Sequence, residues 1–169
     1  MPVIMKKKEL LVRYSEAEDL GHLPPDEQSL VAASREMTTK AYAPYSTFYV
    51  GAAVLLANGE TIVGSNQENG AYPSGLCAER VAVFAASAMF PGMPMVKIAI
   101  SARSKRIEME EPVSPCGACR QVMLEYEALQ KGPIKMLLSK ESGRILVIEK
   151  VSDLLPLAFL GGRLKKEEA

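Results

Sequence analysis

A chain of 169 residues, 48% of them hydrophobic, is long enough to fold as one compact domain with a sizeable core. Its 20 basic and 20 acidic side chains cancel, which argues against a nucleic-acid partner and favours a small substrate. No apolar run is long enough to span a membrane and no signal-peptide core follows Lys6 to Lys8, so with reduced thiols we expect a cytoplasmic protein.

Residues 1–25 form an N-terminal extension with little pattern, which closes at Pro24 and Pro25. The only histidine, His22, lies in this extension, and since nothing nearby completes a metal site we expect it at the surface. A helix is then predicted from Asp26, with Asp26 as its cap. Its apolar stripe consists of Leu30, Val31, Ala33, Met37 and Ala41.

A β-hairpin follows this helix. Residues 50–57 are predicted as a buried strand and residues 60–66 as its antiparallel partner, because Asn58-Gly59 between them is a typical hairpin turn. The polar, turn-rich residues 66–73 are predicted to form a loop.

The second half of the chain alternates predicted helices and strands. A helix at 78–90 is apolar on most faces, and a helix at 117–129 is expected to carry Val122, Leu124 and Tyr126 inside. Strands are predicted at 96–102, 134–139 and 144–149, and Ser152 is predicted to cap a short helix that ends at Leu155.

The order of elements is helix, two strands, helix, strand, helix, two strands. It predicts an α/β fold, a three-layer α/β/α sandwich around a five-stranded mixed β-sheet. We expect residues 26–160 to form this single domain and residues 161–169 to be a charged C-terminal tail.

All three cysteines lie where a loop or strand meets the start of a predicted helix: Cys77, Cys116 and Cys119. An odd number argues against a disulfide framework. Three thiolates can hold Zn²⁺ and leave its fourth position open, as in a catalytic site. Helix N-termini stabilise thiolates, so the placement favours this interpretation.

Glu79 lies two residues after Cys77, near the expected metal yet free to carry a proton. Cys-x-Glu followed by Pro-Cys-x-x-Cys is typical of zinc-dependent deaminases, in which such a glutamate is the general acid and base. Three thiolates leave the Zn²⁺ cluster negative. We expect Arg80, one turn from Cys77, to offset that charge from outside the ligand set, and Arg120 directly follows Cys119.

Other residues allow two interpretations. Phe48 could stack on a flat base, although its position alone favours a core aromatic residue. Asn66 and Glu68 could bind sugar hydroxyls or simply form a polar turn, and Tyr72 could bind a ligand or anchor its loop.

Between about residues 41 and 159 the chain resembles the cytidine deaminases of the small, homotetrameric, zinc-dependent type. The motifs that carry the resemblance are residues 41–46, 50–53, 66–69, 72–73, 77–80, 114–121 and 153–156. The resemblance implies hydrolytic deamination of cytidine and 2′-deoxycytidine to the uridines, in pyrimidine salvage. It assigns Cys77, Cys116 and Cys119 to zinc and Glu79 to proton transfer.

The resemblance also implies roles for substrate-binding residues. Phe48 would stack on the base, Asn66 and Glu68 would bind the ribose hydroxyls, and the backbone at Ala78 would contact the pyrimidine carbonyl. Family members complete each site with a neighbour's loop, here Gly70, Ala71 and Tyr72, which implies a homotetramer. The chain departs from the family at Gly70, where alanine is usual, and in residues 1–25, which could add a strand or a subunit contact.

Three rival functions remain. A deaminase of a modified aminonucleoside, of the blasticidin type, shares the chemistry, but Asn66 and Glu68 favour an unmodified ribose. Polynucleotide and tRNA deaminases usually have histidine where Cys77 stands. The third is a non-catalytic zinc-binding interaction module, in which Glu79 would only begin a helix. Glu79→Gln would leave the behaviour of such a module unchanged, whereas an enzyme would lose nearly all turnover while keeping zinc.

Overall fold

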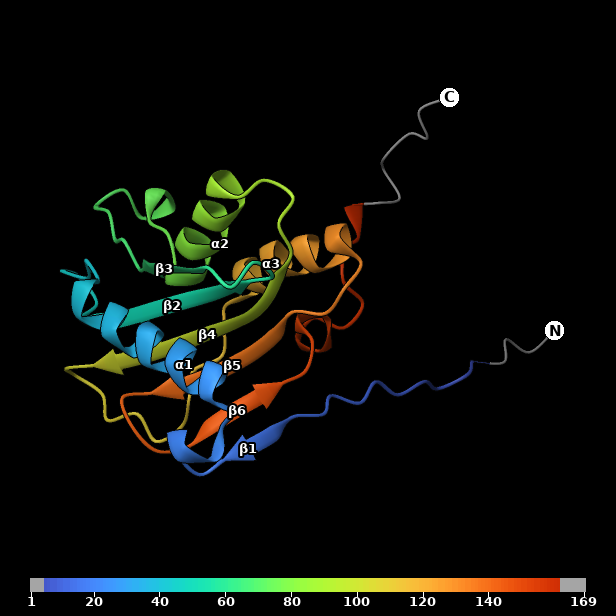
Figure 1. Cartoon of the computed structure of the whole chain (residues 1–169), viewed down its shortest axis with the longest axis horizontal. Coiled ribbons are helices and arrows are strands. Elements are labelled where there is room, and N and C mark those ends of the chain that lie inside the picture. Colours follow the sequence, from blue (N-terminus) through green and yellow to red (C-terminus); the bar gives the residue numbers. More distant parts are fainter. Residues whose placement is uncertain (1–4, 162–169) are drawn as a thin grey trace.

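The computed structural model describes residues 5–161, which form a six-stranded mixed sheet between two layers of helices (Figure 1). The strands are β1 (Ser15–Ala17), β2 (Phe48–Leu56), β3 (Thr61–Ser65), β4 (Met95–Ser104), β5 (Lys135–Lys140) and β6 (Ile145–Ile148). Their order is β1-β6-β5-β4-β2-β3, and only β4 and β5 pair in parallel. The predicted three-layer α/β sandwich is therefore confirmed.

The predicted strand count of five is wrong, because a sixth strand comes from the N-terminal extension. Ser15–Ala17 pairs antiparallel with residues 145–147 of β6 at one edge of the sheet. Only Ala17 of this strand is buried, so its three residues carry no alternating pattern that a sequence could reveal. The division into extension, domain and tail stays a prediction, and residues 162–169 of the tail lie outside the described residues.

Helices cover both faces of the sheet. Helix α1 (Pro25–Met37) crosses one face, and α2 (Ala78–Met89) and α3 (Gly117–Gln130) lie on the other. Each face of the sheet has its own hydrophobic core, and successive residues of the central strands point alternately into one or the other. Val54 and Ile98 pack under α2 and α3, while Ala53 and Ala99 pack under α1. No helix of the described residues is long and apolar enough to cross a membrane.

The predicted hairpin is confirmed, with Gly59 in the left-handed region at φ +87°. Helix α1 instead begins one residue early. Pro25 occupies its first position, which suits proline, and no side chain caps it. Asp26 is therefore not the cap, and its carboxylate accepts a hydrogen bond from Lys97 Nζ at 2.6 Å.

Two details of the C-terminal half also differ from the sequence predictions. The residues of α3 that are buried are Cys119, Met123, Leu124 and Glu127, whereas Val122 and Tyr126 are only partly buried. The helix predicted from Ser152 is a 3₁₀ helix, Val151–Leu154, and Ser152 lies inside it.

Glycine allows α2 to begin directly on the sheet. A Cβ atom at Gly64 of β3 would lie 2.6 Å from the backbone nitrogen of Ala82 and 2.8 Å from the carbonyl oxygen of Ala78. Any side chain there would push the first turns of α2 away. Gly64 thus fixes the place of Cys77 and Glu79, which start that helix.

Beneath α1, the carboxylate of Glu27 is only 2% exposed and is paired with two lysines. Its Oε1 accepts hydrogen bonds from Lys97 Nζ at 2.8 Å and from Lys135 Nζ at 2.9 Å. Burial raises the pKa of Glu27, but the two ammonium groups lower it more, so that it lies below its ordinary value of 4.5. Glu27 is therefore charged at neutral pH and ties α1 to β4 and β5.

Candidate active site

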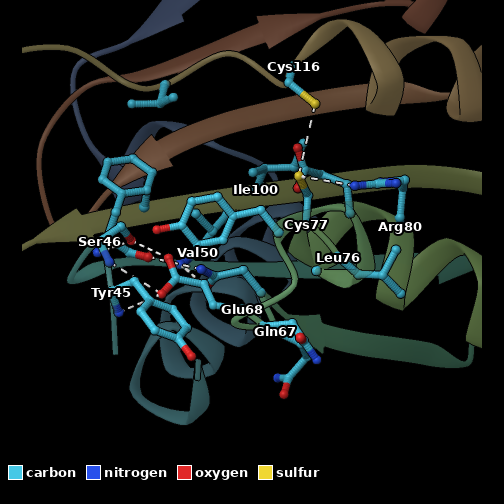
Figure 2. A pocket seen from close by; sticks show the side chains of 18 of the residues that line it. Tyr45, Ser46, Val50, Gln67, Glu68, Leu76, Cys77, Arg80, Ile100 and Cys116 are labelled. Atoms are coloured by element: carbon cyan, nitrogen blue, oxygen red, sulfur yellow. Dashed lines mark hydrogen bonds between the residues drawn. The ribbon is translucent and has the colours of Figure 1, made fainter. Parts of the chain in front are cut away.

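A cavity of about 660 Å³ opens beside the starts of β2, α2 and α3 (Figure 2). Figure 2 shows two ends: Cys77 and Cys116 lie at one, and Tyr45, Ser46 and Glu68 gather at the other. We call these the thiol end and the carboxylate end.

The thiol end brings together the three cysteines that the sequence predicts as ligands. Their sulfur atoms all lie within 4.8 Å of one another. Cys77 and Cys116 immediately precede α2 and α3, and Cys119 is fully buried in the first turn of α3.

The sulfur distances fit a zinc ion. Cys77 Sγ lies 4.0 Å from Cys116 Sγ, which is 3.5 Å from Cys119 Sγ. Tetrahedral coordination with Zn–S bonds of about 2.3 Å sets sulfur atoms about 3.8 Å apart. Three thiols converge at this spacing, and residues 5–161 add no fourth ligand to the cluster, so they form the donor set of an open zinc site.

Hydrogen bonds at the thiol end favour the thiolate of Cys77. A bond from the Cys119 thiol and one from Arg80 lower the pKa of Cys77 to about 5, against the effect of burial. Sharing this proton with Cys77, together with burial, raises the pKa of Cys119. Arg80 Nη2 is 3.7 Å from Cys77 Sγ, as expected for a group that offsets the charge of the cluster.

Arg120 does not reach a sulfur atom, although it follows Cys119 directly. Its Nε donates to the carbonyl oxygen of Pro115 at 2.8 Å, and its Nη1 donates to that of Leu154 at 2.9 Å. Arg120 therefore holds the loop before Cys116 against the 3₁₀ helix Val151–Leu154. A side chain at the start of a helix can point along either flank, which its place in the sequence does not reveal.

Glu79 lies in the first turn of α2, lines the cavity and is only 4% exposed. Burial raises the pKa of its carboxyl group, and the neighbouring charge of Cys77 adds to the effect. A carboxyl group whose pKa is raised holds a proton more readily than a free one, so it can donate a proton as well as accept one. The structure thus places a carboxyl group suited to proton transfer on the wall beside the thiol cluster.

At the carboxylate end, Glu68 holds a turn and also lines the cavity. Its Oε2 accepts hydrogen bonds from the backbone N–H of Tyr45 at 2.9 Å and of Ser46 at 3.3 Å, and its Oε1 accepts a hydrogen bond from the Ser46 hydroxyl. Burial raises the pKa of Glu68, but these three bonds lower it more. One lone pair, on Oε1, remains for a ligand.

Asn66 likewise holds the backbone in place and lines the cavity. Its Oδ1 accepts from the backbone N–H of Val50 at 2.8 Å, and its Nδ2 donates to the carbonyl oxygen of Phe48 at 3.0 Å. The second hydrogen on Nδ2 remains for a ligand in the cavity. The two interpretations of Asn66 and Glu68 in the sequence are therefore compatible with each other.

Phe48 lies on the cavity wall at the start of β2 and is only partly buried, so it is not a core residue. Thr47 before it adopts the left-handed region at φ +54°, a strained conformation for a β-branched residue. The Ser46 hydroxyl also accepts from the backbone N–H of Phe48 at 3.0 Å. This turn fixes Phe48 relative to Glu68.

The loop that contains Gly70, Ala71 and Tyr72 forms only the rim. Tyr72 is 76% exposed and packs edge-on against Tyr45, with ring centroids 6.0 Å apart. Gly70 and Ala71 are exposed and do not line this chain's own cavity. A Cβ at Gly70 would lie 3.1 Å from the Tyr45 hydroxyl, so the usual alanine would crowd that side chain.

Ala78 is fully buried at the first position of α2, and its side chain does not line the cavity. Only its backbone could meet a ligand, since the first N–H groups of a helix have no intrahelical acceptor.

Several lining residues were not predicted from the sequence: Tyr45, Ser46, Val50, Gln67, Leu76, Ile100, Ala102, Val113 and Ser114. Val50 follows Phe48, and Ala102 follows Ile100, at the period-two spacing of one strand face. Strand periodicity could have grouped each pair, but it does not say which face meets the cavity.

Comparison with known proteins gives a consistent result. A family model described as the cytidine and deoxycytidylate deaminase zinc-binding region matches residues 24–131. The chain is 44% identical to a cytidine deaminase of Halalkalibacterium halodurans over 134 residues, which are 79% of this chain and 94% of the relative. It is 42% identical to one from Sporosarcina psychrophila over 135 residues, 79% and 91% of the two chains.

Solved structures agree with these relatives. The crystal structure of a cytidine deaminase from Burkholderia pseudomallei superposes with a TM-score of 0.67 at 41% identity, covering 78% of this chain and 97% of that one. That of a cytidine deaminase from Mycobacterium tuberculosis gives a TM-score of 0.62 at 29% identity, covering 80% and 98%.

Proposed function

Because the chain belongs to the cytidine and deoxycytidylate deaminase family, we propose that its cavity deaminates cytidine and 2′-deoxycytidine hydrolytically, with uridine or 2′-deoxyuridine and ammonia as products. The observation that carries this proposal is the position of Glu79 beside the three thiols, in a cavity that also contains Phe48 and Glu68.

The cofactor is zinc, since the matched region is the family's zinc-binding region and the thiol cluster fits the ion. Cys77, Cys116 and Cys119 would hold it. Zinc supplies the activation of a water molecule as the nucleophile.

Glu79 moves the protons of the reaction. Its carboxylate accepts the proton that the nucleophilic water loses and delivers it to N3 of the pyrimidine, beside the attacked carbon C4. A second transfer through the same carboxylate lets the amino group leave as ammonia. Its burial in the first turn of α2 keeps these protons from exchanging with bulk water.

The remaining side chains orient the nucleoside. Phe48 stacks on the base, the free N–H of Asn66 and the carboxylate of Glu68 bind ribose hydroxyls, and the backbone N–H of Ala78 meets the pyrimidine carbonyl. Arg80 holds the charge of the Cys77 thiolate from outside the ligand set. The cavity walls support these roles, since all of these side chains except that of Ala78 line it.

Glu79→Gln tests the function directly, by ultraviolet absorbance with cytidine, deoxycytidine and cytosine. We expect rapid loss of the cytidine band with wild-type protein, and a turnover roughly 100- to 10,000-fold lower in the variant with its zinc content unchanged. Wild-type turnover in Glu79→Gln would contradict the role of Glu79. If zinc-loaded wild-type protein is inactive on both nucleosides, the proposed substrates are wrong. The protein would then be a deaminase of a modified aminonucleoside or a non-catalytic zinc-binding module.

We further propose a homotetramer in which Gly70, Ala71 and Tyr72 complete the site of a neighbouring subunit. The support is that Gly70 and Ala71 are exposed and lie outside their own chain's cavity, while Tyr72 at the rim is 76% exposed. Light scattering is expected to give four chains per particle. Tyr72→Ala is expected to raise KM for cytidine without changing zinc content. A fully active monomer would contradict the proposal.

We infer a cytoplasmic role in pyrimidine salvage, supported by the three free thiols that the metal requires and by the proposed nucleoside substrates. Fractionation of the producing cells, with the activity in the cytosolic fraction, is the expected result.

A further inference from the structure

A second cavity of about 440 Å³ lies on the α1 side of the sheet. Its lining residues are all polar or charged: Arg35, Thr38, Thr39, Ser101, Arg103 and Glu141. Ser101 and Arg103 alternate along β4 with Ile100 and Ala102, which line the catalytic cavity. Because successive residues of a strand point to opposite faces, the two cavities lie back to back across the sheet.

Arg35, whose side chain lines this cavity, carries a buried donor that lacks an acceptor. Its Nε donates to the carbonyl oxygen of Lys140 at 2.9 Å, which fixes the guanidinium plane. Its Nη2 is buried and has no hydrogen-bond acceptor among residues 5–161. A buried donor on a charged group is costly without an acceptor, so this atom points to a missing partner.

Arg103 is a second fixed guanidinium at the same place. Its Nε and Nη2 donate to the hydroxyl and carbonyl oxygens of Thr38, at 3.1 and 3.3 Å. The group lies 4.4 Å from the centre of the Tyr49 ring. A guanidinium has five N–H donors, so Arg103 keeps donors for a ligand in an orientation that is already set.

The hydroxyl groups of the lining are largely occupied. Thr38 donates to the carbonyl oxygen of Arg35 at 2.8 Å, and Thr39 donates to that of Glu36 at 2.8 Å. The Ser101 hydroxyl is shared between Ser34 and Ser139, at 2.5 and 2.6 Å. The donors left for a ligand are therefore those of the two arginines, which select an acceptor with negative charge.

We propose that this cavity binds the phosphate group of a small molecule, or free inorganic phosphate, between Arg35 and Arg103. Phosphate oxygens match the paired donors of guanidinium groups. Two positive charges face one carboxylate, Glu141, which lies within 4.0 Å of no basic group among the described residues. The cavity volume falls in the range of about 300–1,000 Å³ typical of small-molecule sites.

The test is calorimetric titration of the zinc-loaded protein with inorganic phosphate at constant ionic strength. We expect saturable binding at one site per chain, with a millimolar or tighter dissociation constant, and its loss in Arg35→Met. Glu141→Gln removes the opposing charge and should tighten binding roughly threefold or more. Arg13→Met removes an exposed guanidinium that does not line this cavity, so it is the matched control and should bind like wild type.

Two further arms distinguish the sources of phosphate and the two cavities. Ribose 5-phosphate that binds more tightly than inorganic phosphate would identify a phosphate ester as the ligand, and equal or weaker binding would identify the free ion. Cytidine should not compete with phosphate, because the cavities lie on opposite faces. These experiments measure only the binding of phosphate, so their outcome does not depend on whether the protein deaminates cytidine.

Three results would overturn the proposal: no saturable binding to wild type, binding retained in Arg35→Met, or competition with cytidine. If Arg35→Met does not fold, Glu141→Gln decides, and an unchanged affinity in that variant counts against the site. A crystal structure in which a carboxylate of a second chain fills the cavity would also overturn it, because the arginines would then form a subunit contact.

Discussion

The two ends of the catalytic cavity are built in different ways. At the thiol end, Cys77, Glu79 and Arg80 lie within one turn at the start of α2, and Cys116 and Cys119 occupy the same place at the start of α3. At the carboxylate end, Glu68 is held by residues 22 and 23 positions earlier in the chain. Each half of the thiol end is thus built within one helix start, although the two starts are 39 residues apart. At the carboxylate end, by contrast, no single local segment holds Glu68.

The largest effect should come from the thiol end. Cys119→Ser replaces the fully buried sulfur of the cluster with a weaker ligand. We expect zinc content well below one per chain, a deamination rate at least roughly 100-fold lower and a lower melting temperature, since metal binding contributes to folding. Elemental analysis, initial rates and thermal unfolding measure these changes. Full zinc content with wild-type turnover would remove Cys119 from the ligand set.

A smaller effect is expected at the carboxylate end. Glu68→Gln keeps the shape of the side chain but removes a charged acceptor from Tyr45 and Ser46, and from the ribose that we propose it binds. We expect KM for cytidine to rise about tenfold, with a smaller change in kcat and with zinc content unchanged. Glu60→Gln, at an exposed carboxylate next to the hairpin turn, is the control. A fall in kcat alone would mean that Glu68 acts on the chemical step and not on binding.

The smallest effect on catalysis is expected on the opposite face of the sheet, at Glu27. Since its pKa in the folded chain lies below 4.5, its contribution to stability is present above that pH and is lost as pH falls through the folded pKa. We expect Glu27→Gln to be about 2 kcal/mol less stable at pH 7, with the difference shrinking below about pH 4. Chemical denaturation against pH measures this.

At pH 7 the kcat and KM of Glu27→Gln should stay within about twofold of wild type, because the substitution is remote from both ends of the cavity. A large loss of activity would show that the α1 face and the catalytic cavity are coupled through the sheet.

What the sequence could predict follows the same division. Short-range spacing is enough to bring Cys77, Glu79 and Cys116 to helix starts, so the thiol end could be predicted residue by residue. The hydrogen bonds that hold Glu68 could not be predicted, because their donors in Tyr45 and Ser46 meet its carboxylate only in the folded chain. The left-handed Thr47 is equally hidden, since nothing in a β-branched residue indicates φ +54°.

The helices and strands could be predicted where they are long, whereas the prediction failed where they are short. The long helices and central strands have clear periodicity, whereas β1 has three residues and a single buried side chain. Asp26 shows a different limit: it is a good cap by residue type, but the ion pair with Lys97 and the proline before it decide where α1 begins.

The thiol cluster also links two segments that are far apart in the sequence. Cys77 and Cys116 are 39 residues apart, and the whole of β4, which pairs with β2 and β5, lies between them. A metal held by both residues would bridge the two segments that flank this central strand. Because the site exists only in the folded chain, the free energy of metal binding adds to the stability of the fold. Zinc depletion would therefore lower the amount of intact protein as well as its activity. The metal-free chain would unfold more often and expose its central strand to proteolysis.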